Sequence, residues 1–121
     1  MKIEKFEDLN AWKEARKLNS MTYKLTQRLL KTDYDLAQQM RRCTISVMAN
    51  IAEGFGRYTF KDKRQFFTMA RASISELKSH SYATIDLGCF TKEEFQQIYN
   101  QSEAVGRLIS GMIRITKTNE Q

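Results

Sequence analysis

The sequence contains no proline, and its 121 residues include only one histidine and two cysteines. Proline is excluded from helix interiors and is common in turns and at strand edges, so its absence favours a chain built from long helices. No apolar run approaches the roughly 18 residues of a membrane-spanning helix, which predicts a soluble protein with no membrane partner. The first ten residues lack the apolar segment of a secretory signal, so we expect a cytoplasmic protein.

The few reactive side chains argue against catalysis. Cys43 lies among apolar residues at helical spacing, and we predict that it and Cys89 are reduced, packed thiols rather than a disulfide or a metal site. His80 is the only histidine. The sequence shows no glycine-rich phosphate loop, no nucleophile elbow and no metal-ligand spacing. We therefore predict no catalytic residue, no metal and no cofactor.

Apolar residues that alternate three and four positions apart predict four long helices. Their expected ranges are 8–31, 34–55, 59–87 and 91–117. Asp8 is placed to cap the first helix, and Thr91 with Glu94 forms a capping box for the fourth. Thr59 opens a weaker capping box for the third helix, and Gly88 is the residue type that most readily ends a helix in a left-handed conformation.

These helices fit one all-α domain that spans residues 1–121. Loops of a few residues between long helices predict an antiparallel up-down four-helix bundle. The alternation of three and four is closer to a coiled-coil period than to 3.6, so we expect helix crossing angles near about 20°.

The predicted second helix has more apolar surface than one bundle core can bury. One face, which steps from Leu36 through Met40 and Val47 to Gly54, suits the core. A second face carries four further apolar residues: Ile45, Met48, Ala52 and Phe55. A helix that is apolar on two sides in so short a chain needs a second subunit to cover it. We therefore expect a homo-oligomer whose interface includes this second face.

A polar stripe runs between the two apolar faces of the second helix. Its members are Arg42, Asn50, Glu53 and Arg57, and we expect Glu76 of the third helix to face them. We interpret the set as a hydrogen-bond and ion-pair network that fixes helix register. The alternative is acid–base chemistry by Glu53 and Glu76 beside His80, for which the other parts of an active site are missing.

The distribution of charge gives the main indication of function. The net charge is +6 at pH 7, and the surplus lies in segments 1–31 and 59–88, whereas segments 32–58 and 89–121, which contain the second and fourth helices, are each neutral. Cations in the basic segments recur every seven residues, which predicts an outward stripe on each helix. The predicted nucleic-acid-binding residues are Lys13, Lys17, Lys24, Arg28, Lys31, Arg64, Arg71 and Lys78. Such stripes bind phosphates through counterion release, although the same cations could simply solvate exposed helix faces.

The two basic helices, the first and the third, lie diagonally across an up-down bundle. Their stripes therefore cannot meet on one subunit. In this interpretation a continuous basic surface requires the oligomer.

Most of the chain, from about Phe6 to Ile113, resembles a known family. The similarity is carried by the segment QQMRRCTISVMANIAEGFGR, preceded by YDLA and followed by KDKRQFFTMARASISEL, and by FEDLNAWKEA near the amino terminus. These segments resemble the four-helix-bundle proteins encoded by intervening sequences within bacterial 23S ribosomal RNA genes. The resemblance implies a homopentamer with no established enzymatic activity. The sequence departs from the family pattern at Cys43 and Met48, which bears on local packing more than on the fold.

That family is distantly similar to the accessory variability proteins of diversity-generating retroelements. These are basic pentameric barrels that bind a reverse transcriptase and nucleic acid, so the similarity implies such partners here. We therefore predict a non-enzymatic oligomeric bundle that binds or scaffolds RNA or DNA. The alternative is a protein scaffold, or an accessory subunit of a reverse transcriptase, that does not contact nucleic acid directly.

Overall fold

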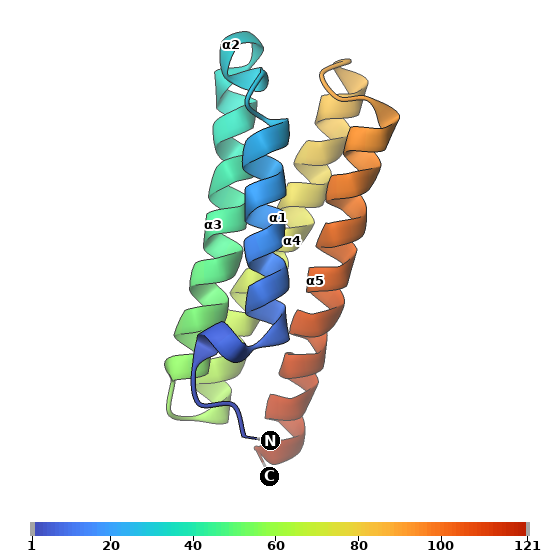
Figure 1. The fold of residues 1–121 in the computed structure, drawn as a ribbon. Helices are drawn as coiled ribbons and strands as arrows, with labels where there is room; N and C mark the ends of the chain where they lie inside the picture. Colours follow the sequence, from blue (N-terminus) through green and yellow to red (C-terminus); the bar gives the residue numbers. More distant parts are fainter. Residues whose placement is uncertain (1, 121) are drawn as a thin grey trace.

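The computed structural model describes residues 2–120, and it contains no strand in that range. Four long helices and two short ones follow one another along the chain (Figure 1). They are the 3-10 helix η1 (Phe6–Asp8) and the α-helices α1 (Asn10–Leu25), α2 (Leu29–Thr32), α3 (Tyr34–Gly56), α4 (Phe60–Asp86) and α5 (Lys92–Asn119). The all-α prediction is confirmed.

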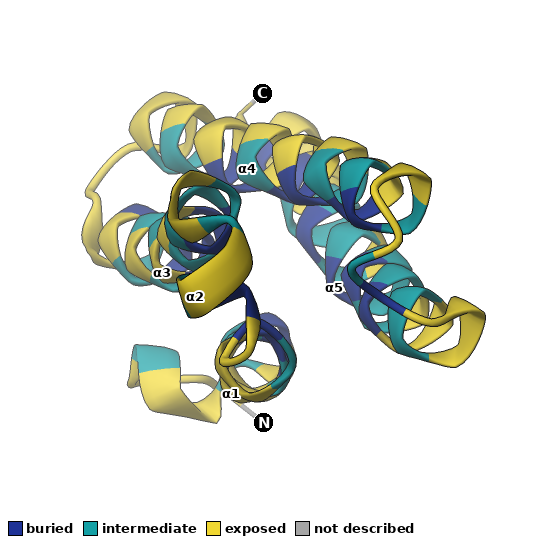
Figure 2. Ribbon diagram, turned by 90° about the horizontal axis from the view of Figure 1, so that it is seen from above, coloured by how far each residue is buried: buried dark blue, intermediate teal, exposed yellow. Residues whose placement is uncertain are grey.

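The four long helices run alternately up and down (Figure 1). α1 packs against α3 and α5, and α4 packs against the same two helices from the other side. Seen from above, α1 and α4 lie at opposite corners of the bundle (Figure 2). This is the diagonal placement that the sequence predicts for the two basic helices.

The core is almost entirely aliphatic and follows the predicted apolar seams. Every buried apolar side chain in it is at most 5% exposed. Among the largest that are fully buried are Leu18, Leu29, Met40, Val47, Ile51, Leu77, Ile98, Val105 and Ile109. Removal of these side chains from water is the main force that holds the four helices together.

Local capping signals set the ends of α4 and α5 as predicted. Thr59 accepts a hydrogen bond from the amide of Asp62 at 3.0 Å at the start of α4. Thr91 and Glu94 make both bonds of the capping box at the start of α5. Gly88, just after α4, has a φ of 73°, the left-handed conformation expected of it.

The prediction of one first helix over 8–31 is wrong, because the helix begins later and is interrupted by a turn. Asp8 lies within η1 rather than at a helix cap, and α1 is preceded by Leu9, which makes no side-chain capping bond. α1 ends at Leu25, and a turn separates it from α2. The structure therefore has a first long helix of 16 residues, shorter than its three companions.

The turn after α1 is bonded by a side chain from α3. The amide of Gln27 bonds to the carbonyl of Lys24, one residue closer than in an α-helix, so the Tyr23 carbonyl loses its helical donor. Arg41 of α3 replaces that donor, because its Nη2 bonds to the Tyr23 carbonyl at 3.0 Å. Its Nε donates to the hydroxyl of buried Thr26 at 2.9 Å, and its guanidinium carbon lies 4.4 Å from the centre of the Tyr23 ring. The turn is therefore held by a side chain from another helix.

Arg41→Ala should lower the free energy of unfolding by about 1–3 kcal/mol, because it removes a charged donor from a backbone carbonyl and a buried hydroxyl. Arg42→Ala is the matched control. Arg42 is exposed and makes no hydrogen bond or ion pair with any of residues 2–120, so its loss should cost at most about 0.5 kcal/mol. Urea unfolding followed by circular dichroism measures both variants, and equal losses would contradict the role given to Arg41.

Candidate nucleic-acid interface

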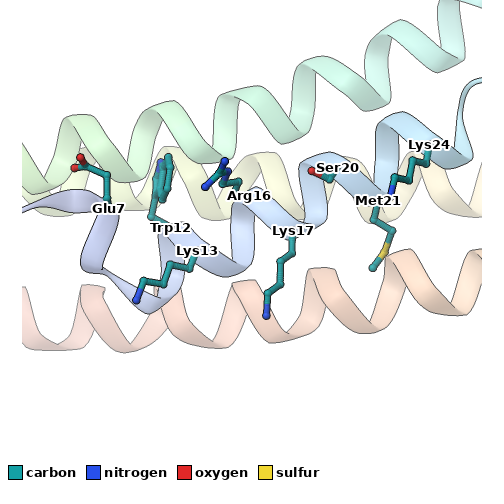
Figure 3. Close-up of a pocket in the computed structure, with 8 residues that line it drawn as sticks. All are labelled: Glu7, Trp12, Lys13, Arg16, Lys17, Ser20, Met21 and Lys24. Atoms are coloured by element: carbon teal, nitrogen blue, oxygen red, sulfur yellow. The ribbon is translucent and has the colours of Figure 1, made fainter.

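α1 carries a basic face that is open to solvent. Lys13, Lys17 and Lys24 line one shallow hollow on it, together with Arg16 (Figure 3). Lys17 contacts Glu14 at 3.0 Å but remains 69% exposed. Lys13 and Lys24 are exposed and form no ion pair with any of residues 2–120. Arg16, which the sequence prediction omitted, adds a fourth cation to this α1 face.

Arg28 and Lys31 lie beyond α1, in the turn and in α2. Lys31 is exposed. Arg28 forms an ion pair with Glu94 and donates to the carbonyl of Cys89 at 3.0 Å, which ties the turn to the start of α5. The hydrogen bond from Arg28 lowers the pKa of Glu94 and raises that of Arg28 itself, so both stay charged. The charge of Arg28 is therefore matched by Glu94 within the chain, and its predicted contact with nucleic acid stays a prediction.

The predicted stripe on the third helix does not point away from the bundle. Arg64 and Arg71 lie along the seam where α4 meets α5, and so does Lys78. Arg64 pairs with Glu120 at 2.6 Å, and this bond raises the pKa of Arg64. Lys78 pairs with Glu103 at 3.2 Å. A heptad spacing keeps residues on one face of a helix, but it does not say whether that face meets solvent or a neighbouring helix.

α5 brings further cations to the same seam. One hollow is lined by Arg71, Lys78, Arg107 and Arg114, and the next by Lys61, Arg64, Arg71 and Lys117. Arg71 belongs to both, so the two hollows form one surface, which we call the α4–α5 groove. Its cations are Lys61, Arg64, Arg71, Lys78, Arg107, Arg114 and Lys117. The sequence prediction that a continuous basic surface requires the oligomer is wrong, because this one lies on a single subunit.

Summing charge over a whole helix hid the α5 contribution. α5 begins with Glu93 and Glu94 and has Arg107, Arg114 and Lys117 in its second half. α5 as a whole carries only +1, although its first half carries −2 and its second half +3. Arg107 and Arg114 are also seven residues apart, so the heptad rule would have found them if each half of the helix had been considered separately.

The α4–α5 groove has the chemistry of a phosphate-binding surface. Arg107 and Arg114 form no ion pair with any of residues 2–120, which leaves both guanidinium groups available for paired bonds to phosphate oxygens. The two arginines are about 10 Å apart along the helix. Gly106 and Ser110 also line this part of the groove. The Ser110 hydroxyl accepts a bond from Arg71 at 3.4 Å, which draws the α4 and α5 cations together.

The predicted polar network is not one network. Glu53 and Arg57 form a local ion pair on α3 at 3.1 Å. Asn50 donates to the hydroxyl of Ser46 at 3.0 Å, and Ser46 is hydrogen-bonded to Ser73 of α4 at 2.9 Å. Among residues 2–120 the serine pair is therefore the only hydrogen bond between side chains on this side of α3 and α4, and Arg57 adds a cation–π contact, 4.5 Å from the centre of the Phe66 ring.

The remaining members of the predicted network lie elsewhere. Glu76 is paired with His80 on its own helix at 3.3 Å, beside Cys43. Glu53 is ten residues beyond Cys43 on α3, about 15 Å along the axis, so the two glutamates do not meet. The alternative of a paired carboxylate is wrong for the same reason. Arg42 is exposed and does not join either group.

The predicted oligomer interface is partly covered within the chain. Of its four residues, Ile45 alone is exposed, at 48%. Met48 packs against the core, and the ring of Phe55 lies beneath the ammonium group of Lys63, 5.5 Å from its centre. Burial lowers the pKa of Lys63. Met48 and Phe55 are therefore only half-exposed, and they lie at the edges of the predicted interface.

The exposed side of α3 contains a line of small, uncharged residues. Ala49, Ala52 and Gly56 line a hollow beside Phe6 of η1, with Glu53 and Arg57 at its edge. With Ile45 they step four, three and four residues along the helix, which places them on one face. We call Ile45, Ala49, Ala52 and Gly56 the α3 outer strip. It replaces the set predicted from the sequence, since it contains Ala49 and Gly56 in place of Met48 and Phe55.

Neither cysteine is in a disulfide within residues 2–120. Cys43 is buried and Cys89 is half-buried. Burial, with a smaller contribution from the nearby Glu76 carboxylate, raises the pKa of the Cys43 thiol to about 12. Cys43 is therefore a protonated thiol at neutral pH.

Within the described chain, no helix combines the length and the apolar character that crossing a bilayer would require.

Comparison with known proteins agrees with this architecture. The sequence model described as 23S rRNA-intervening sequence protein matches residues 7–111. A crystal structure at 1.70 Å of a protein with unknown function from the S23 ribosomal protein family of Bacteroides thetaiotaomicron superposes with a TM-score of 0.82. It is 19% identical, and the match covers 86% of this chain and 98% of that one, which establishes a similar fold. No curated protein matches the chain significantly.

Proposed function

Because this chain belongs to the family of 23S rRNA-intervening sequence proteins, we propose that it is a non-enzymatic helical bundle that assembles with copies of itself and binds RNA or DNA. The resemblance stated from the sequence is confirmed by the family match. The proposed nucleic-acid role rests above all on one observation, the α4–α5 groove, in which cations from two antiparallel helices line one surface.

The balance of charge in the groove supports a polyanionic partner. Its seven cations are accompanied by two carboxylates, Glu103 and Glu120, each of which already bonds a groove cation. The excess charge therefore has no partner among residues 2–120, and a phosphate backbone would supply one. Affinity from such contacts comes from counterion release and needs no base sequence.

The α1 face offers a second, separate contact. Lys13 and Lys24 are exposed, and the face lies diagonally across the bundle from α4. One strand of nucleic acid therefore cannot follow both surfaces of one subunit without bending around α5. In an assembly, the α1 face of one copy and the groove of another can contact the same nucleic acid.

Assembly is supported by the α3 outer strip. It presents apolar and small residues to solvent on a helix whose opposite face fills the core, and such a face is stabilised when another subunit covers it. We propose a homopentamer, the state that the family resemblance implies.

Substituting both Arg107→Glu and Arg114→Glu should weaken binding of a short fluorescein-labelled RNA duplex at least about tenfold. The slope of log affinity against log salt should become shallower by about two, because two phosphate contacts are lost. Fluorescence anisotropy at salt concentrations from about 50 to 200 mM measures both quantities, with a DNA duplex as the second probe.

The matched control carries Arg42→Glu and Lys92→Glu, which change the net charge by the same amount at exposed positions outside the groove. Its loss of affinity should be much smaller. A further variant with Lys13→Glu and Lys24→Glu tests the α1 face. If groove and control variants bind alike, the groove does not carry the binding. If the parent binds neither probe at low salt, a protein scaffold or a reverse transcriptase accessory subunit replaces the proposal.

A further inference from the structure

Three different metal-ligating side chains converge where α3 packs on α4. They are Cys43 of α3 with Glu76 and His80 of α4, and their sulfur, oxygen and nitrogen ligand atoms all lie within 4.8 Å of one another. The Nε2 of His80 is 3.3 Å from a carboxylate oxygen of Glu76. Within residues 2–120 no other group of three such side chains comes this close.

We propose that Cys43, Glu76 and His80 bind one Zn²⁺ ion. Zinc accepts thiolate, imidazole and carboxylate ligands together, at about 2.3 Å for sulfur and about 2.0–2.2 Å for nitrogen and oxygen. Ligand atoms around such an ion are roughly 3.5 Å apart, so the three side chains need only small rotations to reach it. Magnesium and calcium ions fit this site poorly, because they prefer sites with oxygen donors alone.

The helical framework holds the donors on the correct side. Glu76 and His80 are four residues apart on α4, so they share a face, and Cys43 meets that face from α3. The cysteine is 4% exposed, whereas the His80 and Glu76 side chains are 26% and 54% exposed. The site is therefore closed on the thiol side and open to solvent on the carboxylate side, which leaves the fourth coordination position to water.

Charge and protons balance in this site. Binding replaces the proton on the Cys43 sulfur with the metal, and that proton goes to the buffer. One thiolate and one carboxylate then neutralise the two positive charges of the ion, and neutral imidazole completes the protein ligands. The bound ion links α3 to α4 at their middle, on the seam opposite to the α4–α5 groove. The site is thus separate from the proposed nucleic-acid surface.

Titration of the full-length protein with Co²⁺, followed by competition with Zn²⁺, tests the proposal. We expect one equivalent of Co²⁺ to give a near-ultraviolet thiolate-to-cobalt absorption band, which Zn²⁺ abolishes by displacement. Zn²⁺ should also raise the thermal midpoint, because it binds only the folded chain tightly. Mg²⁺ should do neither.

The two cysteines provide a matched pair of variants. Cys89→Ser should keep the band, whereas Cys43→Ser should lose it. His80→Gln and Glu76→Gln change partly exposed side chains, and each should weaken Co²⁺ binding at least tenfold while circular dichroism stays unchanged. A parent without the band, a band that survives in Cys43→Ser, or equal affinity of the parent and His80→Gln would overturn the proposal.

Discussion

Gly54→Ala is expected to lower the free energy of unfolding by about 1–3 kcal/mol, although alanine is the better helix former. A Cβ atom at Gly54 would lie 2.5 Å from Cε1 and 2.7 Å from Cδ1 of Phe67, and 3.2 Å from the carbonyl oxygen of Lys63. Carbon atoms cannot approach that closely, so the ring or the helix must move. Phe67 is only 5% exposed, and its ring has little room in which to move.

Gly106→Ala is the same substitution, but it is expected to raise the free energy of unfolding. There the added Cβ would lie 3.6 Å from Cγ2 of Ile74, which is an ordinary van der Waals contact. The substitution should therefore stabilise the protein by up to about 1 kcal/mol, the helix-forming advantage of alanine over glycine. Denaturant unfolding of both variants gives the comparison. If Gly54→Ala and Gly106→Ala change the free energy of unfolding in the same direction, then α3 and α4 do not require a residue without a Cβ atom at Gly54.

The helix ends that could be predicted are those set by neighbours in sequence. Thr91 and Glu94 cap α5 within a single turn, and Gly88 ends α4 by its own conformation. The break between α1 and α2 could not be predicted in this way. It depends on Arg41, which is 18 residues from the Tyr23 carbonyl that it bonds. A local pattern carries no information about a donor that arrives from another helix.

Only some cations of the α4–α5 groove could be predicted, again because a local pattern does not show how helices pack. The seven-residue period correctly grouped Arg64, Arg71 and Lys78, because residues at that spacing share one face of a helix. Which helix that face meets depends on packing, and the stripe proved to border α5. Arg107 and Arg114 were not predicted, because acidic residues in the first half of α5 offset most of the positive charge in its second half.

Axial register explains the errors in the polar stripe. The sequence shows that Glu53 and Glu76 each lie on a face toward the neighbouring helix, but it does not give the height at which two antiparallel helices are aligned. The observed alignment sets Cys43 beside Glu76 and His80, and Ser46 beside Ser73. The same alignment that separates the predicted carboxylate pair thus assembles the three donors of the proposed metal site.

If the chain assembles as proposed, Ala49→Glu is expected to convert the assembly into single chains while leaving the helix content unchanged. Ala49 is exposed at the centre of the α3 outer strip, so a glutamate there has room in the isolated subunit. In an assembly that buries the strip, each copy would bring a charge into an apolar interface without a partner, at a cost of several kcal/mol per site. Light scattering coupled to size exclusion should give the parent a mass of five times 14.2 kDa and the variant a mass of 14.2 kDa.

Ala72→Glu separates this effect from the general effect of added charge. Ala72 is also an exposed alanine within a long helix, but it lies on α4, outside the α3 outer strip. The substitution has the same small helix-propensity cost and the same change in net charge, so the assembled mass should persist. If both variants dissociate, the strip is not the specific interface. If the parent itself has a mass of 14.2 kDa, no surface of α3 is covered by a second copy, and the assembly proposal fails whatever the variants do.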